Sequence, residues 1–158
     1  MPPMPATAAV RIRRADITDL DDLVALEQTT FDSDRLSRTQ YRRHLDSDSA
    51  LVLVAMADHR HLLGCAVVFF RRGSRVARLY SIASRDEARG RGVGTALLGA
   101  AETAARRRHC REVRLEVRAG NTDAIRLYER HGYHRLGPLP GYYEDGTDGW
   151  RYGKPLQI

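Results

Sequence analysis

Short apolar runs separated by polar turns occupy the middle of the chain, a pattern typical of a sheet. Residues 51–57 and 62–70 are apolar and flank the polar turn 58–61, which predicts an antiparallel hairpin. Residues 76–83 form another apolar run after the next turn, so three consecutive strands make a meander. An alternating segment at 10–13 predicts a short edge strand before them.

Two short helices are predicted between that edge strand and the hairpin. Thr18 with Asp21, and Ser37 with Gln40, have the spacing of a capping box, in which two side chains each bond the other residue's backbone amide. Apolar residues at helical spacing follow each pair. The polar segment 32–36 is therefore expected to be the loop that joins the two helices.

The second half of the chain alternates between strands and helices. Residues 80–98 run from an apolar strand through a charged loop and three glycines into an amphipathic helix. A strand at 113–118 follows, and because a helix separates it from the previous strand, the two are expected to be parallel. Asn121 is expected to cap a further helix that ends at Gly132. Three segments complete the chain: a strand at 133–136, a loop at 138–141 and a last edge strand at 150–156.

These elements predict an α/β (α+β) fold with a mixed sheet of about six or seven strands and about four flanking helices. The chain has 158 residues, which suffices for one domain with a real core, expected over residues 10–158. Residues 1–9 are too short and too poor in apolar residues for a signal peptide, and are expected to be a disordered tail. No apolar run approaches the ~20 residues that span a bilayer, so no membrane partner is expected.

The charge of the chain is +6, and Lys154 is its only lysine. Basic chains bind nucleic acid or phosphorylated small molecules. The densest run, Arg106–Arg108, ends a predicted helix, where cations favour the helix dipole, so a nucleic-acid partner is not expected. Cys65 and Cys110 are too few for a disulfide framework and lack metal-ligand spacing, which fits a reducing cytoplasm and no metal.

The three glycines at alternate positions, Gly90, Gly92 and Gly94, precede a helix start. A helix start leaves free N–H groups and a partial positive charge, and glycine lets a ligand approach the backbone. Together they predict an anion cradle, most often for a phosphate, against the alternative of a plain tight turn. The spacing matches neither a P-loop nor the Gly-x-Gly-x-x-Gly of a dinucleotide fold.

Two motifs together, Arg89-Gly90-Arg91-Gly92-Val93-Gly94 and residues 115–133 with their run Gly120-Asn121-Thr122-Asp123-Ala124, resemble the GNAT N-acetyltransferase superfamily. The resemblance is greatest to the ribosomal-protein alanine N-acetyltransferase (RimI) and N-terminal acetyltransferase branch, and spans Val10 to about Leu156. It implies the GNAT fold with a splayed parallel strand pair, acetyl-CoA as co-substrate, and an acyltransferase that acts on a protein or peptide amine. A small-molecule amine is the alternative acceptor, and a non-catalytic acyl-CoA- or RNA-binding module is the alternative outside enzymes.

The resemblance assigns the cofactor-binding residues. Backbone N–H groups of the first motif and the helix start would hold the pyrophosphate, and two arginine side chains there could add charge-assisted bonds. Ile82 and Ala83 would pair with the pantetheine arm like an added strand, and an N–H there would stabilise an oxyanion. Asn121 would both cap its helix and lie near the arm. The pyrophosphate residues are Arg89, Gly90, Arg91, Gly92, Val93, Gly94 and Thr95.

The resemblance makes Tyr128 the general acid and Glu116 the general base. Tyr128 lies seven residues after Asn121, about two helical turns, so both project from one face. A phenol of pKa ~10 can protonate a thiolate of pKa ~8.5 only when it is well placed, and the alternative for Tyr128 is a core aromatic. Arg114 and Arg118 flank Glu116 at i±2, so a salt-bridged strand face is the alternative there. Asp32 is a second candidate base.

Tyr142 and Tyr143 precede two acidic residues in a loop near the C-terminus. By resemblance to N-terminal acetyltransferases, this tyrosine pair would bind the first residues of a peptide; the alternative is a polar turn with two packing tyrosines. Segments 34–38, 77–83 and 142–146 also resemble a bacterial subgroup of this family. The chain departs from that subgroup at residues 84–86, where an apolar residue and a nearby proline are more usual, so a looser loop is expected there. Gly149 replaces a residue with a side chain, which is expected to alter the last strand.

Overall fold

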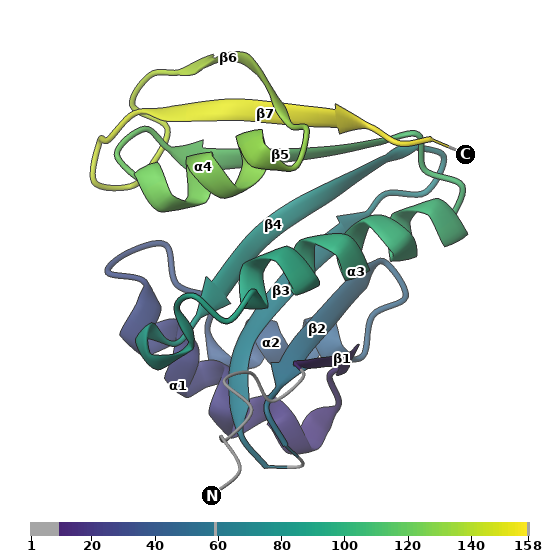
Figure 1. Cartoon of the computed structure of the whole chain (residues 1–158), viewed down its shortest axis with the longest axis vertical. Helices are drawn as coiled ribbons and strands as arrows, with labels where there is room; N and C mark the ends of the chain where they lie inside the picture. Colours follow the sequence, from purple (N-terminus) through teal and green to yellow (C-terminus); the bar gives the residue numbers. More distant parts are fainter. Residues whose placement is uncertain (1–9, 59, 158) are drawn as a thin grey trace, which may run out of the picture.

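A single mixed sheet organises the chain, in the strand order β1-β2-β3-β4-β5-β7-β6 (Figure 1). The computed structural model describes residues 10–58 and 60–157, so the predicted tail at 1–9 lies outside the described residues. The strands are β1 (Arg11–Arg14), β2 (Ala50–Met56), β3 (Leu62–Phe70), β4 (Val76–Ser84), β5 (Glu112–Arg118), β6 (His134–Leu139) and β7 (Gly149–Pro155). The helices are α1 (Leu20–Thr30), α2 (Arg38–Leu45), α3 (Val93–Arg107) and α4 (Thr122–Arg130), with the 3-10 turns η1 (Ile17–Asp19) and η2 (Asp86–Ala88).

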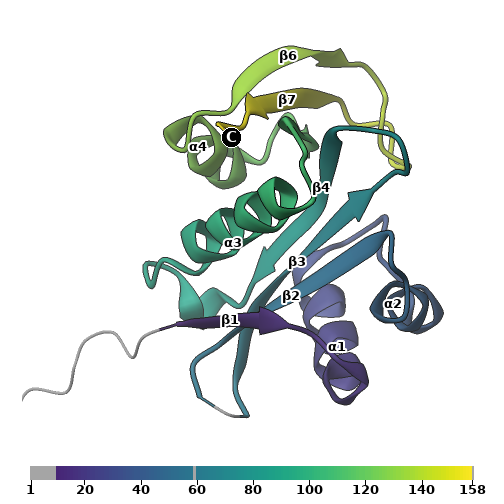
Figure 2. The ribbon, with the colours of Figure 1, turned by 90° about the vertical axis from the view of Figure 1, so that its right-hand side faces the viewer.

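Helices cover both faces of the sheet. Figure 2 shows α3 on one face and α1 and α2 on the other. The alternation of side chains along the strands divides the core in two: Ala66 of β3 packs with α3, whereas Cys65 and Val67 beside it pack with α1 and α2. The α/β class, the seven-stranded mixed sheet and the four helices confirm the predicted fold. No helix in the described part of the chain combines the length and apolarity that crossing a membrane requires.

The parallel pair β4–β5 separates after its first residues. Val76–Leu79 pair with Glu112–Leu115, and no pairing follows, although β4 continues to Ser84 and β5 to Arg118. At the point of separation Val67 pairs with Ser81 while Val68 pairs with Leu79, so Tyr80 is an extra residue in β4. Such a bulge bends its strand, and here it turns β4 away from β5. Figure 1 shows the divergence, and it confirms the expected splay.

The last two strands differ from the expected arrangement. The strand predicted at 150–156 as an edge is β7, and it lies between β5 and β6, so β6 forms the edge. The segment expected to be a loop at 138–141 begins as the end of β6, because Pro138 and Leu139 continue the pairing with β7. An edge strand tolerates proline, which cannot donate to a ladder, and this explains Pro138 in β6.

Helix caps agree with the sequence in two of three places. Ser37 and Gln40 form the predicted box, with bonds of 3.1 Å and 2.8 Å between each side chain and the other residue's amide. Asn121 caps α4 through the Ala124 amide at 3.2 Å. The box predicted at Thr18 and Asp21 is wrong: it is formed by Asp16 and Asp19, because η1 precedes α1 and moves the first helical turn towards the N-terminus.

Candidate functional site

A cleft of about 1210 Å³ lies where β4 and β5 separate. It is lined by the end of β4, the loop before α3, the start of α4 and parts of two further loops. The predicted site residues that line it are Ile82, Ala83, Arg89, Gly90, Gly94, Asn121 and Tyr128, together with the second candidate base Asp32. The other predicted residues lie around it: Arg91, Gly92, Val93 and Thr95 beside the glycine loop, Glu116 on β5, and Tyr142 and Tyr143 in the β6–β7 loop.

The glycine loop leads into α3 through two left-handed residues. Gly90 has φ +79° and Gly92, the N-cap of α3, has φ +74°, and an added Cβ would meet no atom within 4 Å at either position. These glycines are therefore required by their backbone conformation and not by lack of space. The third glycine differs, because a Cβ on Gly94 would lie 3.0 Å from Leu127 Cδ2, so Gly94 lets α3 pack closely on α4.

The start of α3 presents free backbone donors. The helix begins at Val93 with Gly92 as its N-cap, and its first helical bond joins the Ala96 amide to the Gly92 carbonyl at 2.9 Å. Within the described chain, the amides of Val93, Gly94 and Thr95 make no hydrogen bond. Three free N–H groups at the positive end of a 15-residue helix are an arrangement that favours a negatively charged group.

The two arginines of the glycine motif differ in position. Arg89 lines the cleft and lies 3.6 Å from Asp123 and 3.9 Å from Asp86, so part of its charge is already balanced. Arg91 is outside the cleft lining. The hydroxyl of Thr95 lies 3.1 Å from His131 Nε2, which links the start of α3 to the end of α4 beside the cradle.

The end of β4 offers an open edge to the cleft. Ile82 and Ala83 pair with Ala66 and Cys65 of β3 on one side, whereas β5 has already left on the other. An extended ligand with amide groups can occupy that free edge. The loop after β4, expected to be loose, is held to β3: Arg85 donates its amide to the Leu63 carbonyl at 2.8 Å and its Nε to the Leu62 carbonyl at 2.6 Å.

Tyr128 lies at the cleft on the buried side of α4. Only 6% of the residue is exposed, and its ring packs against Tyr133 at 5.8 Å between centroids. Its hydroxyl has no hydrogen-bond partner among the described residues, although its atoms line the cleft. Burial raises the pKa of the Tyr128 phenol above its ordinary value, so the hydroxyl keeps its proton at neutral pH.

Glu116 is held by two arginines from neighbouring strands. Its side chain is 11% exposed and lies 2.5 Å from Arg78 of β4 and 3.8 Å from Arg151 of β7. The expected partners, Arg114 and Arg118, bind elsewhere, so that part of the prediction is wrong. Directly opposed residues on paired strands are closer than i±2 neighbours, and Glu116 is opposed to Arg151. Among the described residues that line the cleft, Asp32 is present and Glu116 is not.

The two tyrosines of the β6–β7 loop pack edge to face, with ring centroids 5.0 Å apart. The Tyr142 hydroxyl accepts a bond from Arg78 at 3.2 Å, which connects this loop to Glu116. Burial raises the pKa of Tyr143 to about 12. Gly149 makes room for this arrangement, since a Cβ there would lie 3.0 Å from the Tyr143 ring and 3.1 Å from the Val117 carbonyl.

Three cleft residues, Arg118, Ser33 and Thr147, were not assigned to the site from the sequence. They line the cleft on the side of the α1–α2 and β6–β7 loops, together with Asp145, one of the two acidic residues that follow the tyrosine pair. Arg118 was expected only as a neighbour of Glu116 on the strand face. It is the last residue of β5, just before the Gly120-Asn121 turn, and this position brings its side chain to the cleft. The sequence gives no signal for Ser33 and Thr147, because the length and conformation of their loops decide whether they reach the cleft.

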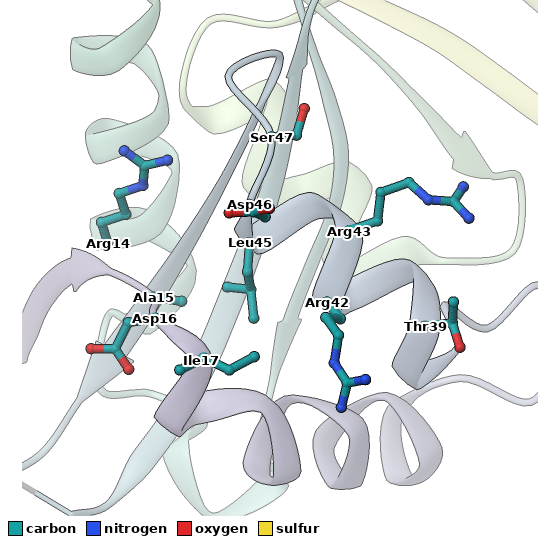
Figure 3. Close-up of a pocket in the computed structure, with 10 residues that line it drawn as sticks. All are labelled: Arg14, Ala15, Asp16, Ile17, Thr39, Arg42, Arg43, Leu45, Asp46 and Ser47. Carbon is teal, nitrogen blue, oxygen red and sulfur yellow. The ribbon is translucent and has the colours of Figure 1, made fainter.

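A second hollow of about 930 Å³ lies between the end of β1 and α2, away from the cleft (Figure 3). Its floor includes Ala15 and Leu45. Three arginines border it, but Figure 3 shows that Arg14, Arg42 and Arg43 extend in different directions. Because their guanidinium groups do not converge, these three arginines do not form an anion site in the hollow.

The sequence profile of the Acetyltransferase (GNAT) family matches residues 17–133, which include the glycine loop, β5 and α4. The chain belongs to the GNAT family. It is therefore an acyltransferase, and the matched residues include the glycine loop and the splayed strand β5.

Related proteins agree over almost the whole GNAT chain. An N-alpha-acetyltransferase of Sulfurisphaera tokodaii is 30% identical over 157 residues, with 92% of this chain and 93% of that protein covered. The structure of Ard1 from Thermoplasma volcanium is 27% identical, with TM-score 0.83 over 95% of this chain and 99% of that one. The ribosomal-protein-S18-alanine N-acetyltransferase from Escherichia coli has TM-score 0.83 over 95% and 96% at 24% identity, and it shares the fold.

Proposed function

We propose that this GNAT enzyme transfers the acetyl group of acetyl-CoA to the N-terminal α-amine of a protein or peptide. The observation that carries the proposal is the cleft itself, which connects a free-amide cradle to the unpartnered phenol of Tyr128 and opens between two loops. The N-alpha-acetyltransferase relative, similar over 92% of the chain, supports this acceptor class. Two free buried cysteines support a cytoplasmic setting.

The residues of the cleft suit acetyl-CoA. The unbonded amides of Val93, Gly94 and Thr95 are donors for its pyrophosphate, with Arg89 beside them. The free edge of β4 at Ile82 and Ala83 offers backbone groups to its amide-containing arm, and Asn121 lines the same cleft. When bound, acetyl-CoA supplies an activated acetyl thioester. A backbone N–H on the free edge would stabilise negative charge that develops on the carbonyl oxygen.

Tyr128 is assigned as the general acid. It lines the cleft and keeps its proton on an oxygen that no other described residue binds. At ordinary values, proton transfer from a phenol of pKa ~10 to a thiolate of pKa ~8.5 is uphill by about 2 kcal/mol. Placement therefore matters more than acidity, and the packing of Tyr128 against Tyr133 supports a fixed position.

The acceptor amine must be neutral to attack. An N-terminal amine has pKa ~7.7–8.0, so about a tenth is neutral near pH 7, whereas deprotonation of a lysine amine at ~10.4 requires about 3.5 kcal/mol more. Glu116 is assigned as the base that accepts, through a water molecule, the proton that the amine nitrogen loses as it attacks the thioester. Asp32, which lines the cleft, is the other candidate. Tyr142 and Tyr143 are assigned to the first residues of the acceptor peptide.

Thiol release from acetyl-CoA, measured against a panel of peptides and a panel of small amines, tests the acceptor. We expect turnover with peptides that have a free N-terminus, and none with the same peptides after N-terminal blocking. A blocked peptide that retains an internal lysine is the matched control, since acetylation of it would indicate a side-chain amine. Turnover confined to polyamines, amino acids or antibiotics would overturn the proposal in favour of a small-molecule acceptor.

A titration with acetyl-CoA during thermal unfolding tests the donor. Saturation at a hundred times Kd should stabilise the folded protein by about 2.7 kcal/mol, and desacetyl-CoA should do nearly the same because it retains the pyrophosphate. Adenosine, which lacks the pyrophosphate, is the control. Absence of stabilisation by acetyl-CoA would contradict the assigned cradle.

A further inference from the structure

Arg118 is the last residue of β5 and binds two loops at once. On one side its Nη2 donates to Ser33 Oγ at 2.6 Å and to Asp34 Oδ2 at 2.8 Å, both in the α1–α2 loop. On the other its Nη1 donates to both oxygens of Asp145 at 3.0 Å and to Thr147, in the β6–β7 loop. One guanidinium therefore spans the distance between segments that are more than a hundred residues apart in the chain.

The direction of Arg118 follows from the alternation of β5. Val113, Leu115 and Val117 point into the core below α3, so Arg118 and Glu116 point to the opposite face. The two loops also lie on that side, since α1 and α2 cover it (Figure 2). The Arg118 contacts are thus across the sheet from the cradle of α3, at the side of the cleft left for the acceptor.

The contacts of Arg118 are stronger than those of an exposed pair. Its side chain is 30% exposed, and its guanidinium lies 4.1 Å from the centre of the Tyr143 ring. A planar guanidinium can stack on an aromatic ring while its edge binds carboxylates. Asp145 is further oriented by the amide and hydroxyl of Thr147, and these bonds together with Arg118 lower the pKa of Asp145 to about 2.

The α1–α2 loop contains a left-handed residue at the point that Arg118 holds. Asp34 has φ +55°, a turn conformation that Asp tolerates better than most residues with a side chain. In the described part of the chain no hydrogen bond or ion pair joins the two loops directly; each reaches the other through Arg118. Removal of the guanidinium would leave Asp34 and Asp145 as two like charges facing one another across the opening.

We propose that Arg118 is a positioning residue that clasps the α1–α2 loop to the β6–β7 loop and so sets the acceptor opening of the cleft. The proposal rests on the proposed function only in that the opening receives the acceptor. The clasp holds the Tyr143 ring and the Ser33 and Thr147 hydroxyls at a constant separation, which suits an extended chain end. Its single positive charge also offsets one of the two carboxylate charges at the opening.

Arg118→Ala is the main test, with Arg114→Ala as the matched control. Arg114 is on the same strand and face, but its guanidinium binds Glu112 of its own strand at 3.0 Å and touches neither loop. We expect Arg118→Ala to raise the KM of the acceptor at least about tenfold while the KM of acetyl-CoA stays within twofold. Arg118→Lys, which keeps the charge without the planar fork, should recover part of the loss.

Hydrogen exchange of the free protein supplies a readout that needs no acceptor. The amides of residues 31–36 and 141–148 should exchange faster together in Arg118→Ala and remain unchanged in Arg114→Ala. Faster exchange in only one loop, or an equal rise in the KM of both substrates, would overturn the clasp. If the wild type used only small amines, the proposed function would fail, and the exchange experiment would still decide the clasp.

Discussion

Replacement of Tyr128 by Phe tests whether the Tyr128 hydroxyl acts in catalysis or only in the stability of the fold. The hydroxyl of Tyr128 bonds to no described residue, so its removal leaves no buried group without a partner, and the free energy of unfolding should change by less than about 0.5 kcal/mol. As the general acid, Tyr128 should contribute about 10²–10⁴-fold to kcat. That loss corresponds to roughly 2.7–5.4 kcal/mol in the activation free energy.

Tyr133 is the matched control, because its ring contacts that of Tyr128 and its hydroxyl, unlike that of Tyr128, has a hydrogen-bond partner. It donates a 2.9 Å bond to Glu102, which is 6% exposed and is also bound by Lys154. Tyr133→Phe should therefore destabilise the protein by about 1–3 kcal/mol, or roughly 2–4 °C in Tm per kcal/mol, with kcat nearly unchanged.

Steady-state thiol release and thermal unfolding of both variants provide the comparison. Acetyl-CoA affinity, from the same unfolding experiment with ligand, should be similar in wild type and Tyr128→Phe. A Tyr128→Phe enzyme with wild-type kcat would refute the general-acid assignment. A fall in kcat that accompanies an equal loss of stability in both variants would show that the two rings act only through packing.

Three further predictions concern single positions. Gly92→Ala, at φ +74°, should cost about 1–2 kcal/mol in unfolding experiments, whereas Gly99→Ala, in open space inside α3, should gain about 0.5–1 kcal/mol; equal effects would contradict the backbone explanation. Asp19 is buried and its pKa is lowered by the guanidinium of β1, so its contribution is present above pH ~3.9 and lost as pH falls through its folded pKa. Asp19→Asn should remove about 1–3 kcal/mol at neutral pH and flatten that acidic dependence in pH-dependent denaturation. Glu116→Gln should lower kcat at least about 100-fold, with the effect of Asp32→Asn much weaker; the reverse order would move the base to Asp32.

Local signals in the sequence predicted most of the elements correctly. The box of Ser37 and Gln40 and the cap at Asn121 depend on residues three positions apart, so no distant contact is needed to recognise them. The box at Asp16 and Asp19 was missed because the same signal occurs two residues later, and only the packing of η1 distinguishes the two. The glycine loop was predicted as a backbone turn into a helix start, but the role of Gly94 against Leu127 required the position of α4.

The order of the strands and the partners of the charged residues depended on the tertiary structure. β7 enters between β5 and β6, which places Arg151 opposite Glu116 and removes Arg114 and Arg118 as its partners. Nothing local favours that insertion, because a strand's neighbours are chosen by contacts between segments far apart in the chain. The same holds for Arg118, whose four polar partners come from two loops.

By itself, then, the sequence determined the glycine turn into the start of α3, the alternation of each strand and the positions of Tyr128 and Asn121 about two turns apart at α4. These depend on backbone conformation and periodicity, which neighbouring residues control. The tertiary structure decided that the bulge at Tyr80 opens the sheet, that Glu116 is held by Arg78, and that Arg118 joins two loops. A guanidinium has no local preference among carboxylates, so its partner is whichever one the fold brings within reach.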